Sequence, residues 1–241
     1  MIAVVVFVVG ARLRPASWSQ TGEENAGTLV LDLAKTFFAA VVAFIVVLCW
    51  QQFDSTYRST VAEANSLAET YWLTHQMPDP EHHRIQGLLP DYTTGVIAAE
   101  WPVMARDHRL DQPTQTSFDT LRGSVESMRP ADPYIGGLRA SALSSLTQVA
   151  KARQDRAAAA GHQTPGFWYL LLYFGAVKLL LSPVLSGVKL GRRSVMMTAL
   201  LGVVVGLVIV LIHTLDHPFS GGYTVSREAF ESALSRYTHI T

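Results

Sequence analysis

The chain contains the run VMMTALLGVVVGLVIVLIHTL, Val195 to Leu215, followed directly by Asp216-His217-Pro218-Phe219-Ser220-Gly221-Gly222. A helix needs about 20 apolar residues to cross the ~30 Å hydrocarbon core of a bilayer, and this run is long enough. The polar turn that follows is rich in proline and glycine and stops the helix at one interface. Together the two features predict a membrane protein.

Two further segments, Leu29 to Trp50 and Phe167 to Val188, are also apolar and long enough to span. A fourth apolar run, Met1 to Val9, is too short. Arg12 and Arg14 follow this run, whereas the basic residues of a secretory signal precede its apolar part. We interpret it as the end of a short first membrane helix; a frayed interfacial segment is the alternative.

Composition excludes several classes of protein. The 241 residues include 19 Lys and Arg and 19 Asp and Glu, so the sequence predicts no nucleic-acid partner. The single cysteine, Cys49, lies inside a membrane segment and has no partner within the chain for a disulfide. A disulfide-stapled secreted module and a Cys/His zinc site are therefore both disfavoured, and we expect no metal and no cofactor.

The polar block Gln51 to Thr164 has the size of a domain and a helical pattern throughout. Its first apolar stripe, at three- and four-residue steps, consists of Phe53, Tyr57, Val61, Ala64, Ala68, Tyr71 and Trp72. No glycine or proline lies between Leu29 and Met77. We therefore predict one rod of roughly 70 Å, at ~1.5 Å per residue, that ends at Pro78-Asp79-Pro80.

Three more helices are predicted, at Glu81 to Met104 with Pro90 as a candidate bend, at Thr114 to Met128, and at Pro133 to Ala160. The inward-facing residues would be Ile85, Leu88, Leu89, Tyr92, Val96, Trp101, Phe118, Leu121, Val125, Leu138, Leu143, Leu146 and Val149. Strand signals are absent. The predicted fold is all-α: a polytopic membrane protein with three full membrane helices and one short N-terminal one, plus a helical extramembrane domain between the second and third. The predicted segments are 1-50, 51-164, 165-215 and a turn with tail at 216-241.

This order of helices carries recognisable motifs: Trp50-Gln51-Gln52-Phe53, Glu100-Trp101-Pro102, Leu215-Asp216-His217-Pro218-Phe219-Ser220-Gly221 and Val225-Ser226-Arg227-Glu228-Ala229-Phe230-Glu231. Together they resemble the bestrophin-like family of bacterial membrane proteins, over nearly the whole chain. The last two motifs are the most specific part of the resemblance.

Bestrophins are pentameric ion channels that mostly conduct anions, with a helical cytosolic domain between the second and third of four membrane helices. The resemblance implies a homo-oligomer, a pentamer, that passes small inorganic ions such as chloride. This chain differs from the bestrophin turn Asn-Pro-Phe-Gly at two positions: it has His217 in place of Asn and Ser220 in place of Gly. The acidic cluster that binds calcium in animal bestrophins is missing, so calcium gating is not implied.

The second membrane helix offers a candidate pore lining. Phe37, Val41, Phe44 and Leu48 fall within about 60° of one another, and Ala39, Ala40 and Ala43 occupy another sector. Bulky apolar rings around an axis form a constriction that gates by dewetting, and the resemblance places a phenylalanine neck on this helix in bestrophins. The alternative is that these rings face lipid or pack as ordinary core.

Two charges are ion-pathway candidates. Lys178 lies near the middle of the third segment, where an unpaired ammonium costs about 3 kcal/mol, so it should face protein or water. Asp32, on the same membrane side, is a candidate partner. In the alternative, the Lys178 stem carries its charge to the nearer interface.

The histidines support weaker hypotheses. His213, Asp216 and His217 have the i, i+3, i+4 spacing of a metal site or proton relay. Pro218 follows at once, so we favour a structural turn made by Asp216, His217, Pro218, Phe219 and Gly221, with Pro218 and Phe219 docked on the helical domain or on a neighbouring subunit. His75, His82 and His83 flank the proline turn as solvated loop residues.

Two functions are compatible with the sequence: a homo-oligomeric ion channel in a bacterial cell membrane, or a non-conducting scaffold or sensor whose helical domain binds a partner. An enzyme is not expected, since no catalytic constellation stands at active-site spacing. The side of the helical domain stays open. By the positive-inside rule the domain would lie outside, because one membrane side carries Arg12, Arg14, Lys35, Lys189, Arg192 and Arg193. The charge bias is modest, since Arg58, Lys151, Arg153 and Arg156 lie on the domain's side. The resemblance places the domain in the cytosol.

Overall fold

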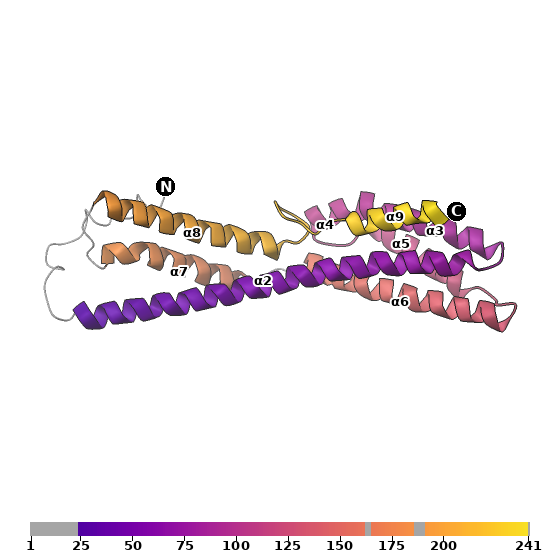
Figure 1. Cartoon of the computed structure of the whole chain (residues 1–241), viewed down its shortest axis with the longest axis horizontal. Helices are drawn as coiled ribbons and strands as arrows, with labels where there is room; N and C mark the ends of the chain where they lie inside the picture. Colours follow the sequence, from indigo (N-terminus) through magenta and orange to yellow (C-terminus); the bar gives the residue numbers. More distant parts are fainter. Residues whose placement is uncertain (1–23, 162–164, 186–190, 241) are drawn as a thin grey trace. The chain divides into compact units, whose positions relative to one another are not determined.

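The computed structural model describes residues 24-161, 165-185 and 191-240, and this part of the chain is helical without a strand (Figure 1). The short first membrane helix expected at Met1 to Val9 lies outside the described residues. The chain divides into two compact units. One, the membrane unit, comprises Met1–Trp50 and Thr164–Asp216; the other, the helical unit, comprises Gln51–Gln163 and His217–Thr241. The turn and tail, which we expected as a separate segment, are therefore grouped with the helical unit from His217 onward.

Helix α2 (Glu24–His75) is one helix of 52 residues, as the absence of glycine and proline between Leu29 and Met77 predicts. It ends two residues before Met77, because Pro78 disfavours helical backbone in the residue that precedes it. The long uninterrupted helix predicted after Leu29 is therefore confirmed. Its first half belongs to the membrane unit and its second half to the helical unit.

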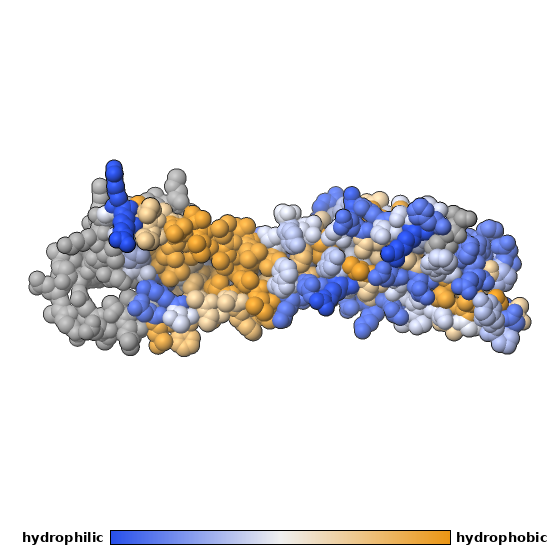
Figure 2. All heavy atoms as spheres, viewed as in Figure 1, coloured by the Kyte–Doolittle hydropathy of each residue, from blue (hydrophilic) through white to orange (hydrophobic). Residues whose placement is uncertain are grey.

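The membrane unit also contains α7 (Gly166–Leu185) and α8 (Arg192–Asp216). By length and composition, α2, α7 and α8 are each able to cross a membrane. Figure 2 shows the resulting band of apolar side chains over these helices. Three helices of spanning length are thus present, in agreement with the sequence.

Helices α2 and α7 approach closely at a glycine. A Cβ built on Gly175 would lie 2.0 Å from the Phe38 ring, so the absence of a side chain at this position makes room for that ring. Small residues permit such close helix packing in membranes, where the hydrophobic effect drives no helix association. Gly175 is therefore a packing residue of the membrane unit.

We expect Gly175→Ala to lower stability by about 1–3 kcal/mol, because the Phe38 ring has to leave its position. The measurement is thermal unfolding of the full chain in detergent. Gly206→Ala on α8 is the matched control, since a Cβ there meets nothing within 4 Å and alanine is the better helix former. Equal melting temperatures of the two variants would contradict the packing role.

The helical unit has a hydrophobic core to which every one of its described helices contributes. Its further elements are α3 (Glu81–Gly95), the π-helical turn η2 (Val96–Glu100), α4 (Trp101–Asp107), α5 (Gln112–Glu126), α6 (Pro133–Gly161) and α9 (Glu228–Ile240). Most of the residues predicted to face inward are buried, and Leu88, Trp101 and Leu143 are half-buried. An N-cap starts α5, where Asp111 Oδ2 accepts from the Thr114 N–H at 3.1 Å.

The helix predicted from Glu81 to Met104 is interrupted, and the interruption lies at η2 rather than at Pro90, which sits inside α3. Pro102 has no N–H to donate to the carbonyl of Ala98, and its ring crowds that carbonyl. The backbone widens there: the Trp101 N–H donates to the Val96 carbonyl, five residues back. A π turn is a common response to such a break and often lies at functional positions.

The buried face of α2 differs from the predicted apolar stripe. Tyr57 and Trp72 are exposed, whereas Thr60, Glu63 and Thr70 are fully buried. The threonines tolerate burial because their hydroxyls donate to backbone carbonyls four residues earlier, Thr60 to Thr56 at 2.9 Å and Thr70 to Ser66 at 2.8 Å. Buried Glu63 needs partners from elsewhere in the fold.

Helix α9, absent from the sequence prediction, completes the core. Its Phe230 is fully buried, and Tyr237 stacks on Tyr71 of α2 with ring centroids 4.5 Å apart. Tyr237 Oη also lies 3.2 Å from Thr93 Oγ1 of α3. Burial raises the pKa of Tyr237 to about 12, so this hydroxyl keeps its proton.

Candidate functional site

The candidate pore residues lie on a face of α2 that packs against neither α7 nor α8, the other described helices of the membrane unit. Phe37, Phe44 and Leu48 are 65%, 59% and 44% exposed, and Val41 is half-buried. The residues that α2 turns toward α7 and α8 are others, among them Phe38. At 3.6 residues per turn, Phe38 points about 100° away from Phe37. The described helices therefore leave a bulky apolar stripe of α2 uncovered.

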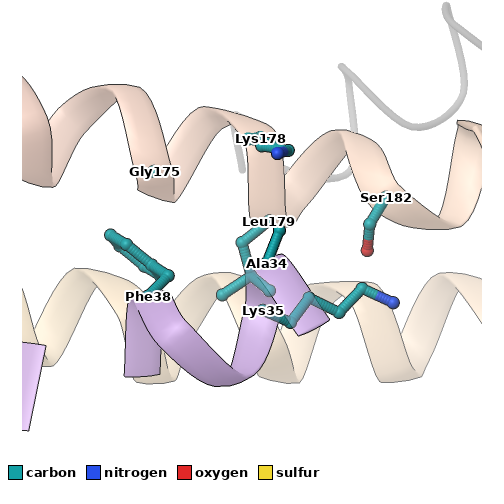
Figure 3. A pocket seen from close by; sticks show the side chains of 7 residues that line it. All are labelled: Ala34, Lys35, Phe38, Gly175, Lys178, Leu179 and Ser182. Atoms are coloured by element: carbon teal, nitrogen blue, oxygen red, sulfur yellow. The ribbon is translucent and has the colours of Figure 1, made fainter. Parts of the chain in front are cut away.

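We expected the two ion-pathway candidates, Asp32 and Lys178, to pair with each other, but Asp32 has a different partner. Asp32 Oδ1 accepts a hydrogen bond from Lys35 Nζ at 2.9 Å, one helical turn away on α2. Lys178 lies on α7 at a small cavity that Lys35 also lines (Figure 3). Asp32, the expected partner of Lys178, is therefore paired with Lys35, which lies on the same helix as Asp32.

The predicted turn follows α8 directly. Asp216 is the last residue of the helix, and its Oδ2 accepts from Tyr169 Oη at 2.7 Å within the membrane unit. Gly221 has a φ of 109°, a conformation that glycine adopts without steric cost. The Val225 N–H donates to the Pro218 carbonyl at 2.8 Å and closes the loop. The backbone conformation of Gly221 accounts for the glycine of the motif.

Phe219 is docked on the helical unit, one of the two alternatives that the sequence left open. It is 6% exposed and meets Trp101 of α4 edge to face, with ring centroids 5.6 Å apart. Trp101 in turn meets Phe230 of α9 at 5.8 Å. The three rings tie the C-terminal segment to the start of α4.

The structure also reveals a site that the sequence analysis missed: a buried cluster of four charges and a phenol, formed by Glu63, Tyr92, Glu100, Arg153 and Arg156. These residues come from α2, α3, η2 and α6, and all five side chains are fully or almost fully buried. Two carboxylates face two guanidinium groups, so the cluster is neutral overall. We call it the buried ion cluster.

Bidentate pairs hold the buried ion cluster together. Arg156 donates to both oxygens of Glu63, from Nε at 3.0 Å and from Nη2 at 2.9 Å, and its Nη1 lies 2.8 Å from Glu100 Oε1. Arg153 donates to both oxygens of Glu100, at 2.9 and 2.5 Å. Arg156 thus bridges the two carboxylates, and planar guanidinium groups suit this geometry better than lysine.

Electrostatics keep Arg156 and Tyr92 of the cluster protonated. Burial would lower the pKa of Arg156, but the negative charges of Glu63 and Glu100 outweigh it and raise that pKa above the ordinary value. Burial, followed by the charge of Glu63, raises the pKa of Tyr92 well above its usual range. Tyr92 therefore keeps its proton and donates to Glu63 Oε1 at 2.7 Å.

The cluster also contacts the aromatic rings that hold the C-terminal segment. The Arg156 guanidinium lies 5.7 Å from the Trp101 ring centroid and 5.4 Å from that of Phe230, which are cation-π distances. Phe219 packs on the same tryptophan. One charged residue of α6 is thus in contact with two of the three rings.

Arg153 and Arg156, which the sequence analysis counted only as charges on the domain's side of the membrane, are buried in the core. Both lie at the next steps of the apolar stripe that Leu146 and Val149 begin on α6, so their side chains enter the core. That spacing was a usable signal. Glu100, inside the motif Glu100-Trp101-Pro102, was another.

The histidines do not form a metal site in the described part of the chain, where no group of three or more His, Cys, Asp and Glu side chains could hold an ion. His75 and His82 lie with ring centroids 5.2 Å apart beside the proline turn. His217 lies beside His108 of the helical unit, with ring centroids 6.2 Å apart.

Comparisons with known proteins agree with this fold. A family model described as the Bestrophin-like domain matches residues 1–230. A comparison with curated proteins found no match. The crystal structure of a bacterial bestrophin homologue from Klebsiella pneumoniae, solved by Zn-SAD phasing, has a TM-score of 0.76 at 12% identity and covers 99% of this chain and 96% of that chain.

A crystal structure of the Klebsiella homologue with a point mutation has a TM-score of 0.75 at 12% identity, covering 99% of this chain and 97% of that one. At this identity the likeness shows the fold, and the family match rests on the sequence. That match covers most of the chain, and the protein therefore belongs to the bestrophin-like family.

Proposed function

We propose that this protein is a subunit of a homo-oligomeric ion channel in a bacterial cell membrane, a pentamer by resemblance, which passes small anions through a pore lined by α2. The observation that carries the proposal is the uncovered apolar stripe of α2, with Phe37 and Phe44 more than half exposed in the protomer. Membership of the bestrophin-like family and the shared fold support it.

The packing of the membrane unit supports α2 as the pore-lining helix. Helices α7 and α8 both lie along one side of α2, where Phe38 and Val42 face them. The opposite side of α2 has no covering helix among the described residues of this unit. In a closed ring of protomers, that side is available to face the axis.

The chemistry of the stripe suggests how the pore would close. A ring of phenylalanines carries no hydrogen-bonding groups that could replace the hydration shell of an ion. Such a constriction excludes hydrated ions until it widens or wets. Phe37 and Phe44, two turns apart on the helix, would form the neck, with Val41 and Leu48 on the same face. The ion-pathway role of Lys178 and Asp32 stays a prediction.

Removing the rings tests the proposal. Phe37→Ala and Phe44→Ala are expected to raise the open probability or the leak severalfold, because a methyl group leaves a wider and more easily wetted neck. The measurement is the current of purified protein in planar bilayers under a chloride gradient.

Phe174→Ala on α7 is the matched control, since Phe174 is equally exposed but belongs to another helix. It should leave the current unchanged. If neither the wild type nor the α2 variants conduct any small ion while the oligomer stays intact, the channel proposal fails and the scaffold alternative takes its place.

A further inference from the structure

A small cavity of about 30 Å³ lies between α2 and α7, within the membrane unit (Figure 3). Lys35 of α2 and Lys178 and Ser182 of α7 supply its polar lining. Ser182 is buried at 7% exposure, whereas the Lys178 side chain is exposed. Of the described residues that line the cavity, two carry ammonium groups and none carries a carboxylate.

The positive charge at this place is only partly compensated. Asp32 pairs with Lys35, but its side chain is 71% exposed, and no ion pair of Lys178 is found within the described part of the chain. Arg192 and Arg193 begin α8 at the same end, where Arg193 shares a cavity with Pro183 of α7. Cationic groups that lie close together among membrane helices need an anion beside them.

An apolar groove of about 600 Å³ adjoins this cavity and shares Lys35, Phe38 and Leu179 with it. Three helices form the groove: α2 contributes Val42 and Val46, α7 contributes Leu172 and Ala176, and α8 contributes Val205 and Val208. Apart from Lys35, every side chain that lines it is apolar. The protomer thus has a basic cavity at the end of a hydrocarbon-lined groove.

We propose that the membrane unit binds one anionic phospholipid, with the phosphate between Lys35 and Lys178 and one acyl chain in the groove between α2, α7 and α8. Charge complementarity selects the headgroup, because basic pockets between membrane helices attract anionic lipids. The apolar lining of the groove favours the acyl chain of the lipid. A free phosphate would leave the groove empty, and a helix of a second copy would leave the two ammonium groups without an anion.

This site is separate from the proposed pore. Lys35 and Phe38 lie on the side of α2 that faces α7, and Phe37 and Phe44 lie on its uncovered side. Lipid binding therefore requires no conduction, and the two proposals can fail independently.

The headgroup is tested with full-length protein in detergent, titrated with dioleoylphosphatidylglycerol or with dioleoylphosphatidylcholine, and with native mass spectrometry and thermal unfolding as readouts. We expect phosphatidylglycerol to be retained and to raise the melting temperature, and phosphatidylcholine to do neither. The double variant Lys35→Met, Lys178→Met should weaken the apparent Kd for phosphatidylglycerol by roughly tenfold or more. Lys151→Met, at an exposed lysine of α6, is the control and should bind like the wild type.

The groove is tested by filling it. Ala43→Phe places a ring in the groove and should lower phosphatidylglycerol retention, whereas Ala40→Phe, which does not line the groove, should retain the lipid. An excess of inorganic phosphate should displace no lipid. If the lysine variants bind phosphatidylglycerol as the wild type does, or if Ala43→Phe changes the oligomer without changing lipid retention, the proposal is overturned and a second copy occupies the groove.

Lys178→Met alone separates the lipid site from the ion pathway. Reduced phosphatidylglycerol retention in this variant supports the lipid site. If the variant changes the anion preference but retains the lipid fully, Lys178 acts in the ion pathway and the lipid-site proposal is contradicted. If the protein retains lipid through these lysines but never conducts ions, the lipid site is supported and the channel proposal fails.

Discussion

Arg156→Met is expected to destabilise the protein by about 3–5 kcal/mol, because it removes one partner of a buried ion pair and leaves a charge without compensation. Glu63 would lose both guanidinium hydrogen bonds and keep only the Tyr92 hydroxyl, at 2.7 Å. Glu100 would keep Arg153. The loss should appear in thermal or denaturant unfolding of the full chain in detergent.

Burial, rather than ion-pair distance, is the reason for this large effect, and Arg58→Met is the control that shows it. Arg58 pairs with Asp54 at 2.8 Å, as close as the pairs of the buried ion cluster, but its side chain is 78% exposed. Breaking such a surface pair costs about 0–1 kcal/mol. If the two variants lose similar stability, burial does not decide the energetics of the cluster.

A double-mutant cycle isolates the uncompensated charge. Glu63→Gln in the Arg156→Met background removes the carboxylate that has lost its partner and should restore part of the lost stability. If the double variant is as unstable as the sum of the single variants, the two residues act independently.

The second large effect is expected for Phe219→Ala, at about 3–5 kcal/mol for removing a buried phenylalanine ring. Phe219 is 6% exposed and packs on Trp101, which contacts Phe230 and the Arg156 guanidinium. Its loss would open a cavity at the contact that holds the C-terminal segment. Thermal unfolding and the oligomer mass are the measurements, and we expect the oligomer to dissociate more readily.

Phe167→Ala serves as the comparison, since Phe167 is 60% exposed and its removal opens no cavity. Phe219→Leu, which retains most of the apolar volume, should lose less than Phe219→Ala. An oligomer of unchanged mass and melting temperature in Phe219→Ala would show that this ring does not anchor the segment.

Sequence reasoning predicted those features that depend on neighbours along the chain. Three apolar segments of spanning length were visible because a membrane helix satisfies its own backbone and needs only about 20 apolar residues. The continuous helix α2 followed from the absence of glycine and proline between Leu29 and Met77, and its end from Pro78. The break before Pro102 was missed because proline predicts a disturbance of the helix but not whether it bends, stops or widens.

The C-terminal turn was only half predictable. Pro218 and Gly221 identify a turn by their backbone preferences. The partner of Phe219 lies on α4, far away in the sequence, and the sequence left a neighbouring subunit as an alternative. Tertiary packing placed the ring against Trp101.

What the sequence by itself determined is the membrane class, the helical composition and the family, because hydrophobic length, period and local motifs are properties of contiguous residues. Tertiary structure alone decided which polar groups enter the core. Glu63 and Arg156 come from helices far apart in the chain, and burial of either charge is stable only when the other lies within hydrogen-bond distance. That condition depends on how four elements pack, so the buried ion cluster emerges only from the assembled fold.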